Sequence, residues 1–169
     1  MALRNIVQRG DDVLGKVARE VTDYNSRLHT LLDDMRETLI QANGLGLAAP
    51  QVGVLRRVVI VVDINKEDLP YEEQLIELVN PEIIETAGEQ EGTEGCLSVP
   101  GLYGFVKRPN FVKVRAFDRN GNPFEVSGEG ITARAFCHEL EHLDGHLFVE
   151  HCDKLYTEEE LQEMSEEDE

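Results

Sequence analysis

The feature that most constrains the fold of this chain is the segment "HELEH" (138–142), which lies in a stretch whose apolar spacing predicts a helix. Residues four apart share one helical face, so the imidazoles of His138 and His142 can bind one metal ion, and Glu139 projects beside that face. The predicted helix begins after Gly130 and ends near Gly145. Two imidazoles do not complete a catalytic metal site, so the fold must bring a third ligand to this helix from another segment.

Three sources of a third ligand can be compared. The longer metalloprotease pattern HExxHxxGxxH requires a histidine where this chain has Phe148. A glutamate on a following helix would come from residues 158–163, where nothing singles out one side chain. Cysteine is the better source, because a thiolate binds zinc and ferrous iron well. Cys96 lies between glycines that leave room for a ligand, whereas we expect Cys137 and Cys152 to be structural thiols.

The order of helical and strand patterns is typical of an α+β fold. Residues 25–44 have apolar residues at helical spacing, with Asn25 as a candidate N-cap, and predict a long N-terminal helix. Short β-branched or alternating runs predict strands at 56–64, 74–86 and 111–118. The pair Asn120-Gly121 predicts a tight turn between antiparallel strands. We therefore expect mostly antiparallel β-sheets packed around a central HExxH helix.

Length and charge limit the domain organisation, the binding partners and the location that we expect. The 169 residues fit one catalytic domain, 1–156, followed by an acidic C-terminal helix or tail, 157–169, in which Thr157 and Glu160 have capping-box spacing. The formal net charge of −18 argues against nucleic-acid binding and against an anionic membrane surface. We find no apolar run long enough to span a membrane and no signal or transit sequence, so we expect a cytoplasmic protein.

Three motifs taken together resemble the signature motifs of the peptide deformylases: "GLGLAAPQ" (44–51), "EGCLS" (94–98) and "HELEH" (138–142). Their order and approximate spacing match that family, and the resemblance covers most of the chain except the acidic tail. It implies one divalent metal ion, with ferrous iron as the native metal and zinc, nickel or cobalt as substitutes. The implied ligands are Cys96, His138 and His142.

The resemblance also implies a reaction. The substrate would be the N-formyl-methionine end of a newly synthesised protein, which implies transient proximity to the ribosome, and the products would be formate and a free amino terminus. Binding to the metal lowers the pKa of water from about 15.7 towards about 7, so hydroxide can attack the formyl carbon. Glu139 would act as general base and acid, while Gln51 and the Leu97 backbone N–H would stabilise the oxyanion.

Candidate substrate-binding residues come from two segments. Glycines in the first motif leave backbone free to pair with an extended peptide, and its leucines could wall an apolar pocket for the methionine side chain. A tight helix-to-strand turn is the alternative interpretation of those glycines. Residues before His138 on nearly the same helical face are further pocket candidates. The predicted substrate-binding residues are Gly44, Leu45, Gly46, Leu47, Ile131 and Ala135.

Some features depart from the family pattern or stay open. Glu141 stands where deformylases often have Asp, and Cys137 stands where many have Gln, so the resemblance implies no particular hydrogen bonds around the ligands at these two positions. We interpret Arg108 as a strand-end charge in preference to a substrate-binding cation. A metallopeptidase that cuts internal peptide bonds and a non-catalytic metal-binding module remain as alternative functions.

Overall fold

The computed structural model describes residues 2–167, so the last two residues of the predicted tail, Asp168 and Glu169, lie outside it. The described residues form an α+β fold in which all paired strands are antiparallel, as predicted. One sheet has five strands in the order β1-β2-β3-β6-β7, and the other is the hairpin β4-β5. The strands are β1 (Gly46–Ala48), β2 (Val58–Val62), β3 (Leu75–Ala87), β4 (Gln90–Cys96), β5 (Val99–Arg108), β6 (Phe111–Phe117) and β7 (Pro123–Glu129).

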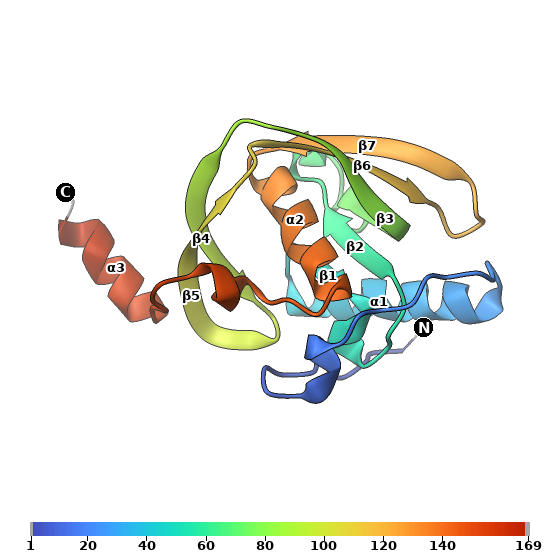
Figure 1. Cartoon of the computed structure of the whole chain (residues 1–169), viewed down its shortest axis with the longest axis horizontal. Helices are drawn as coiled ribbons and strands as arrows, with labels where there is room; N and C mark the ends of the chain where they lie inside the picture. Colours follow the sequence, from blue (N-terminus) through green and yellow to red (C-terminus); the bar gives the residue numbers. More distant parts are fainter. Residues whose placement is uncertain (1, 168–169) are drawn as a thin grey trace.

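Helices cover both faces of the five-stranded sheet. The long helix α1 (Ser26–Ala42) packs on one face, and α2 (Ile131–Leu143), the predicted HExxH helix, packs on the other and lies between the sheet and the β4-β5 hairpin (Figure 1). Every residue of β2 is buried, because alternate side chains point to opposite faces and each face is covered. Its sequence is therefore an unbroken apolar run instead of an alternating one. The central position of α2 brings its polar face next to the hairpin.

The ends of α1 follow local rules. The side chain of Asn25 accepts a hydrogen bond of 3.2 Å from the Leu28 N–H, which confirms the predicted N-cap. At the other end Asn43 adopts the left-handed conformation, with φ of 53°, and closes the helix. This left-handed turn directs the chain at once into β1, so the end of α1 determines where the first motif lies.

One of the two hairpins was predicted from the sequence, and the other was not. The β6-β7 turn at Asn120-Gly121 is confirmed, with Gly121 at φ of +85° and Asp118 N–H donating to Asn122 O at 2.9 Å. The β4-β5 hairpin was not expected, because "QEGTEGC" has few β-branched residues and no clear alternation. Its two strands are joined by the two-residue turn Leu97-Ser98. That short turn places Cys96 at the tip of the hairpin, where it can reach α2.

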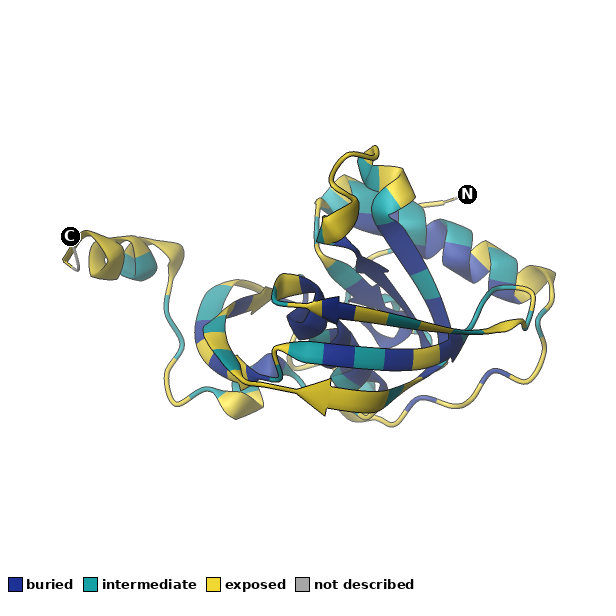
Figure 2. Ribbon diagram, turned by 90° about the horizontal axis from the view of Figure 1, so that it is seen from above, coloured by how far each residue is buried: buried dark blue, intermediate teal, exposed yellow. Residues whose placement is uncertain are grey.

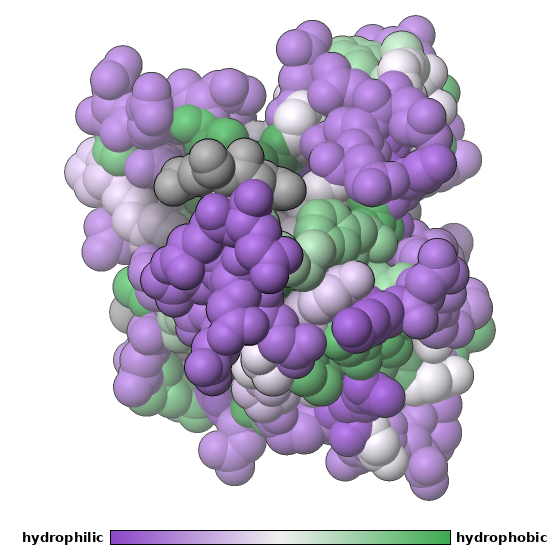
Figure 3. Space-filling model, turned by 90° about the vertical axis from the view of Figure 1, so that its left-hand side faces the viewer, coloured by the Kyte–Doolittle hydropathy of each residue, from purple (hydrophilic) through white to green (hydrophobic). Residues whose placement is uncertain are grey.

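The C-terminal helix α3 (Glu158–Glu167) lies apart from the rest of the molecule (Figures 1 and 2). It begins with the predicted capping box, since Glu160 N–H donates to Thr157 Oγ1 at 3.2 Å and Thr157 N–H donates to Glu160 Oε1 at 3.3 Å. None of its residues is buried, and hydrophilic side chains dominate this end of the molecule (Figure 3). Among the described residues, every helix is too short or too polar to cross a bilayer.

Candidate active site

A thiol and two imidazoles meet at the centre of the molecule. Cys96 comes from the end of β4, and His138 and His142 come from the same face of α2, as their spacing predicts. One donor atom from each of the three residues lies within 4.8 Å of the other two. Cys96 Sγ is 3.5 Å from His142 Nε2, and the two imidazole centroids are 5.1 Å apart. This mixed set of soft and borderline donors fits a divalent transition metal.

Glu94 orients the first of these histidines. Its Oε1 accepts a hydrogen bond of 2.9 Å from His138 Nδ1, which leaves Nε2 of the ring free. Phe148, whose ring stacks at 26° to that of His138 with centroids 5.9 Å apart, supports the imidazole from the side. A free Nε2 in a fixed ring is the condition for binding a metal ion.

The carboxylate of Glu94 is the centre of a buried charge network. Arg108 binds it through two hydrogen bonds, Nε to Oε2 at 2.8 Å and Nη2 to Oε1 at 2.9 Å, and Arg134 Nη1 donates to Oε2 at 2.8 Å. Burial would raise the pKa of Glu94, but the bonds and charges of Arg108 and His138 hold it below its usual range. Glu94 is therefore ionised at neutral pH.

The network adds to our interpretation of Arg108. This arginine ends β5, as predicted, and it is only 5% exposed, so it is a buried strand-end charge. Its Nη1 also donates to Glu141, and Glu141 in turn pairs with His151 Nε2 at 2.9 Å. Glu141, the position that departs from the family pattern, thus bridges α2 to the 3-10 helix at Phe148–His151.

Burial and neighbouring charge set the protonation of the second histidine and of Glu139. Burial and the nearby His138 keep the pKa of His142 well below its usual value, so its ring is neutral and able to donate a lone pair. Burial raises the pKa of Glu139 to about 7. The Glu139 carboxylate lies 3.9 Å from His142 Nε2 and lines the same cavity as Cys96. A carboxyl group with this pKa can both accept and release a proton near neutrality.

Gly46 makes room for Glu139. A Cβ atom at position 46 would lie 2.7 Å from Cγ and 2.8 Å from Oε2 of Glu139. Such distances are well inside van der Waals contact, so any larger residue at position 46 would displace the carboxylate. The glycine is therefore required by close packing against Glu139.

Gln51 is held in one orientation beside the thiol. Its Oε1 accepts a hydrogen bond of 2.9 Å from Ala48 N–H, so its Nε2 faces Ser98 Oγ at 3.1 Å and Cys96 Sγ at 3.4 Å. Ser98 is completely buried, and its N–H also points at Cys96 Sγ at 3.4 Å. Within residues 2–167, the Leu97 N–H donates to no protein acceptor. The Gln51 amide and the Leu97 N–H are thus both close to the thiol.

A cavity of about 440 Å³ opens on this group, and five of the six predicted substrate-binding residues line it. Leu47 does not, contrary to our expectation. It is fully buried among the apolar side chains between α1 and the sheet, because alternation along β1 turns it away from α2. The predicted residues that do line the cavity are Gly44, Leu45, Gly46, Ile131 and Ala135.

The other two cysteines lie outside the donor group. Cys137 is 7% exposed in the core between α2 and the sheet, and burial raises the pKa of its thiol to about 11. Cys152 packs against Gly104 and its Sγ lies 3.5 Å from Phe148 O. Both positions agree with packing roles for these thiols.

Several residues of the site were missed by sequence reasoning. Glu94, Ser98 and Arg134 all touch the donor group or its supports, yet none was assigned a role. Glu94 and Ser98 do lie in the quoted motif "EGCLS", two residues on either side of Cys96, so their place in that motif was the available signal. Arg134 carries no comparable signal, since an arginine four residues before a histidine is common on exposed helices.

Comparisons with known proteins agree with this geometry. The family model described as Polypeptide deformylase matches residues 3–158. A peptide deformylase from Agathobacter rectalis is 57% identical over 150 residues, which cover 89% of this chain and 90% of the relative. The crystal structure of a peptide deformylase from Legionella pneumophila has a TM-score of 0.82 and 38% identity, covering 98% of this chain and 96% of that one. A Met-Ala-Ser-bound class I type b peptide deformylase from Acinetobacter baumannii has a TM-score of 0.80 and 38% identity, covering 89% and 98% of the two chains. This chain therefore belongs to the peptide deformylase family, whose members are enzymes.

Proposed function

We propose that this chain removes the formyl group from the N-terminal formyl-methionine of newly synthesised proteins, giving formate and a free amino terminus. The observation that carries the proposal is the convergence of Cys96, His138 and His142 beside Glu139. Of these four residues, all except His142 line one cavity. The relative from Acinetobacter baumannii was solved with Met-Ala-Ser, a tripeptide that begins with methionine, which supports the same substrate class here.

We propose that one divalent metal ion is held by Cys96, His138 and His142. When bound, such an ion supplies a Lewis acid that polarises a carbonyl oxygen and lowers the pKa of water. Ferrous iron is our candidate for the native metal, and zinc, nickel or cobalt would also suit one thiolate and two imidazoles. The bond from Glu94 to His138 supports this assignment, because it leaves Nε2 of His138 free for a ligand position.

Glu139 is the proposed proton carrier. Its carboxylate takes a proton from the attacking water and passes it to the nitrogen of the departing amine, which is a poor leaving group without a proton. The pKa of about 7 and the position at the cavity wall support both halves of that transfer. We expect Glu139→Gln to keep its metal and to lose about 10²–10⁴-fold in kcat.

Gln51 Nε2 and the Leu97 N–H are the proposed oxyanion donors. Negative charge grows on the formyl oxygen as the tetrahedral intermediate forms. The assignment is supported by the position of Gln51 and Leu97, which line the cavity beside Cys96. Loss of one such donor typically costs about 2.7–4 kcal/mol of transition-state stabilisation.

The peptide chain of the substrate is proposed to pair with β1. This strand is at the edge of the five-stranded sheet, so an extended peptide can add to it through backbone hydrogen bonds. Tyr71 donates its hydroxyl to Gly44 O and so fixes the segment that leads into the strand. Leu45, Ile131 and Ala135 are proposed as apolar walls for the methionine side chain.

The proposed substrate implies where the protein acts and which partners it meets. We propose one catalytic domain, residues 1–156, acting in the cytoplasm with transient proximity to the ribosome, and without direct contact with nucleic acid or membrane. The net charge of −18, with residues 157–169 strongly acidic, supports the last part, because it would repel phosphate groups.

One assay separates this function from its alternatives. The purified enzyme is given a formyl-Met peptide, and formate and free amino groups are measured beside an unformylated peptide with several internal bonds. Release of formate without internal cleavage is the expected result. Internal cleavage would indicate a metallopeptidase, and metal binding without either product would indicate a non-catalytic module.

A further inference from the structure

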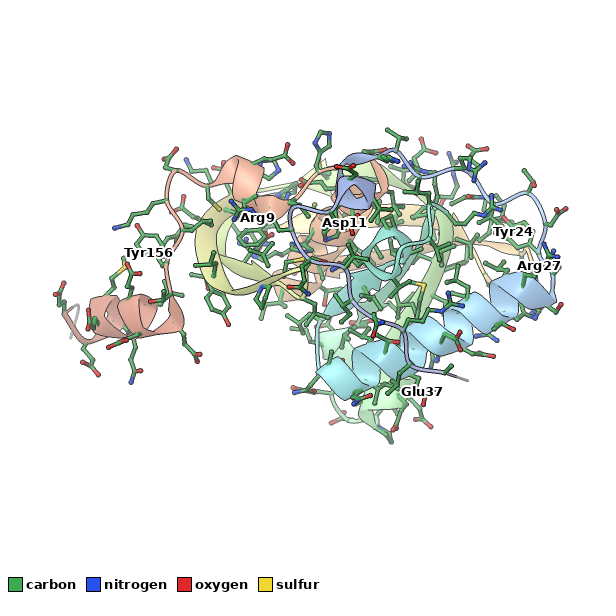
Figure 4. All side chains as sticks on the ribbon, turned by 90° about the horizontal axis from the view of Figure 1, so that it is seen from below. Arg9, Asp11, Tyr24, Arg27, Glu37 and Tyr156 are labelled. Atoms are coloured by element: carbon green, nitrogen blue, oxygen red, sulfur yellow. The ribbon has the colours of Figure 1, made fainter. Side chains whose placement is uncertain are left out.

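The N-terminal segment Ile6–Arg9, which we call the strap, crosses the outside of the molecule behind the proposed oxyanion donors. Val7 N–H donates to Gln51 O at 2.7 Å, and Arg9 N–H donates to Ser98 O, also at 2.7 Å. In Figure 4 the N-terminal chain that contains the strap runs from the vicinity of Glu37 on α1 to Arg9 and Asp11. The strap thus forms backbone hydrogen bonds to both segments that carry the donors.

The side chain of Gln8 adds a third connection. Its Nε2 donates to Leu97 O at 3.4 Å and to Ile6 O at 3.2 Å. Three consecutive residues of the strap therefore contact the carbonyls of Gln51, Leu97 and Ser98. Each of these carbonyls belongs to an oxyanion donor residue or to its immediate neighbour.

The two donor segments need such a link. Gln51 belongs to a 3-10 helix (Ala49–Val52) after β1, whereas Leu97 lies in the turn of the separate β4-β5 hairpin. An oxyanion site works only when both donors are about 2.7–3.1 Å from one oxygen atom. The buried bond from Gln51 Nε2 to Ser98 Oγ joins them through their side chains. The strap joins their backbones, through N–H groups two residues apart that point the same way in an extended chain.

The strap is held independently at both ends. Upstream, Ala2 N–H donates to Asp34 Oδ1 at 2.7 Å and Arg4 N–H donates to Thr38 Oγ1 at 3.0 Å, both on α1. Downstream, Leu14 is buried with 3% exposure. Removal of one N–H in the middle of the strap should therefore leave the segment attached.

We propose that Val7 and Arg9 are positioning residues that fix the separation of the Gln51 and Leu97 donors. This inference rests on the proposed function of those donors. The Val7 N–H holds the backbone carbonyl of Gln51, and the Arg9 N–H holds the backbone carbonyl of Ser98 in the Leu97-Ser98 turn. Neither residue touches the substrate in this proposal.

Proline substitutions test it, because proline has no N–H. We expect Val7→Pro and Arg9→Pro to lower kcat by about tenfold to hundredfold, the loss that a displacement of up to about 1 Å produces. The matched control is Asn5→Pro, at the exposed position directly before the strap, whose N–H binds no acceptor within residues 2–167. Metal content, KM and inhibition by the product peptide Met-Ala-Ser should match the wild type in all three variants. A merely structural role would instead lower metal content and thermal stability, and unfolding of both proline variants would also overturn the proposal.

A double-mutant cycle with Gln51→Ala shows through which residue Val7 acts. If Val7 positions Gln51, Val7→Pro lowers kcat in the wild type and has little further effect in Gln51→Ala. An equal loss of kcat in both backgrounds would refute the positioning role of Val7. If Gln51→Ala itself leaves kcat unchanged, the oxyanion assignment in the proposed function fails instead, so the two failures are distinguishable.

Discussion

His138 donates its Nδ1 hydrogen to Glu94 Oε1 at 2.9 Å, and Glu94 is at the same time bound by two arginines. The carboxylate thus couples a proposed metal ligand to the buried ends of β5 and α2. It determines the tautomer and the orientation of the ring together, because a carboxylate can only accept a hydrogen bond.

The first prediction concerns this carboxylate. We expect Glu94→Gln to weaken metal affinity by about 10–100-fold, as loss of a hydrogen-bond partner of a ligand typically does. It should also destabilise the fold by about 3–5 kcal/mol, because Arg108 loses its buried counter-charge. Metal titration and urea unfolding measure the two effects. Glu91→Gln, at an exposed position of the same strand, is the control, and equal metal affinity in the two variants would contradict the orienting role.

The second prediction separates the three cysteines. Cys96→Ser should lose most of its metal and activity, because a serine hydroxyl is not ionised at neutral pH and binds soft metals poorly. Cys137→Ser and Cys152→Ser should keep both, since neither thiol belongs to the donor group. Elemental analysis with formate release measures the outcome. Full metal occupancy in Cys96→Ser would show that the ligand assignment is wrong.

The third prediction concerns the packing of Gly46 against Glu139. Gly46→Ala should displace the carboxylate and lower kcat by about 10²-fold, because the added Cβ would lie 2.7 Å from Glu139 Cγ. Metal content should stay near one ion per chain, since the three atoms nearest to the added Cβ all belong to Glu139, which is not a proposed ligand. The same substitution in a Glu139→Gln background should cost much less. Gly15→Ala, where an added Cβ would meet no atom within 4 Å, tests for a general effect of a new methyl group on a glycine.

The fourth prediction is a pH dependence of stability at Asp34. Burial would raise the pKa of this carboxyl, but hydrogen bonds from Ala2 N–H and Arg4, together with the Arg4 charge, lower it below its ordinary value. A lowered folded-state pKa stabilises the fold above the unfolded pKa of about 3.9, and that stability is lost as pH falls through the folded pKa.

Asp34→Asn should therefore lower the free energy of unfolding by about 1.5–3 kcal/mol near neutral pH, and by progressively less below about pH 4. Urea unfolding at a series of pH values measures the difference between variant and wild type. Asp68→Asn, at an exposed position, should show little change throughout. A destabilisation by Asp34→Asn that is constant down to about pH 3 would contradict the proposed linkage.

Much of the fold could be predicted from local pattern. The caps and apolar spacing of α1 and α2, the runs that form β2, β3 and β6, and the turn at Gly121 are all set by residues close together in the chain. The β4-β5 hairpin could not be predicted, because its glycines and glutamates acquire strand structure only by pairing with each other around α2. The prediction that Leu47 lines the cavity was wrong for a related reason. Which face of a short edge strand is buried depends on the elements that pack against it.

The sequence by itself determined which residues could bind a metal: the two histidines four apart on a helix, and a cysteine in a recognisable motif. Only the tertiary structure decided how those residues are supported. Arg108, Arg134 and Glu141 join the site through a buried network, and the strap reaches Gln51 and Ser98 from more than forty positions earlier in the chain. The physical reason is that ligand spacing on one helix is a local property. A buried carboxylate, by contrast, can be compensated only by charges that folding brings to it from elsewhere.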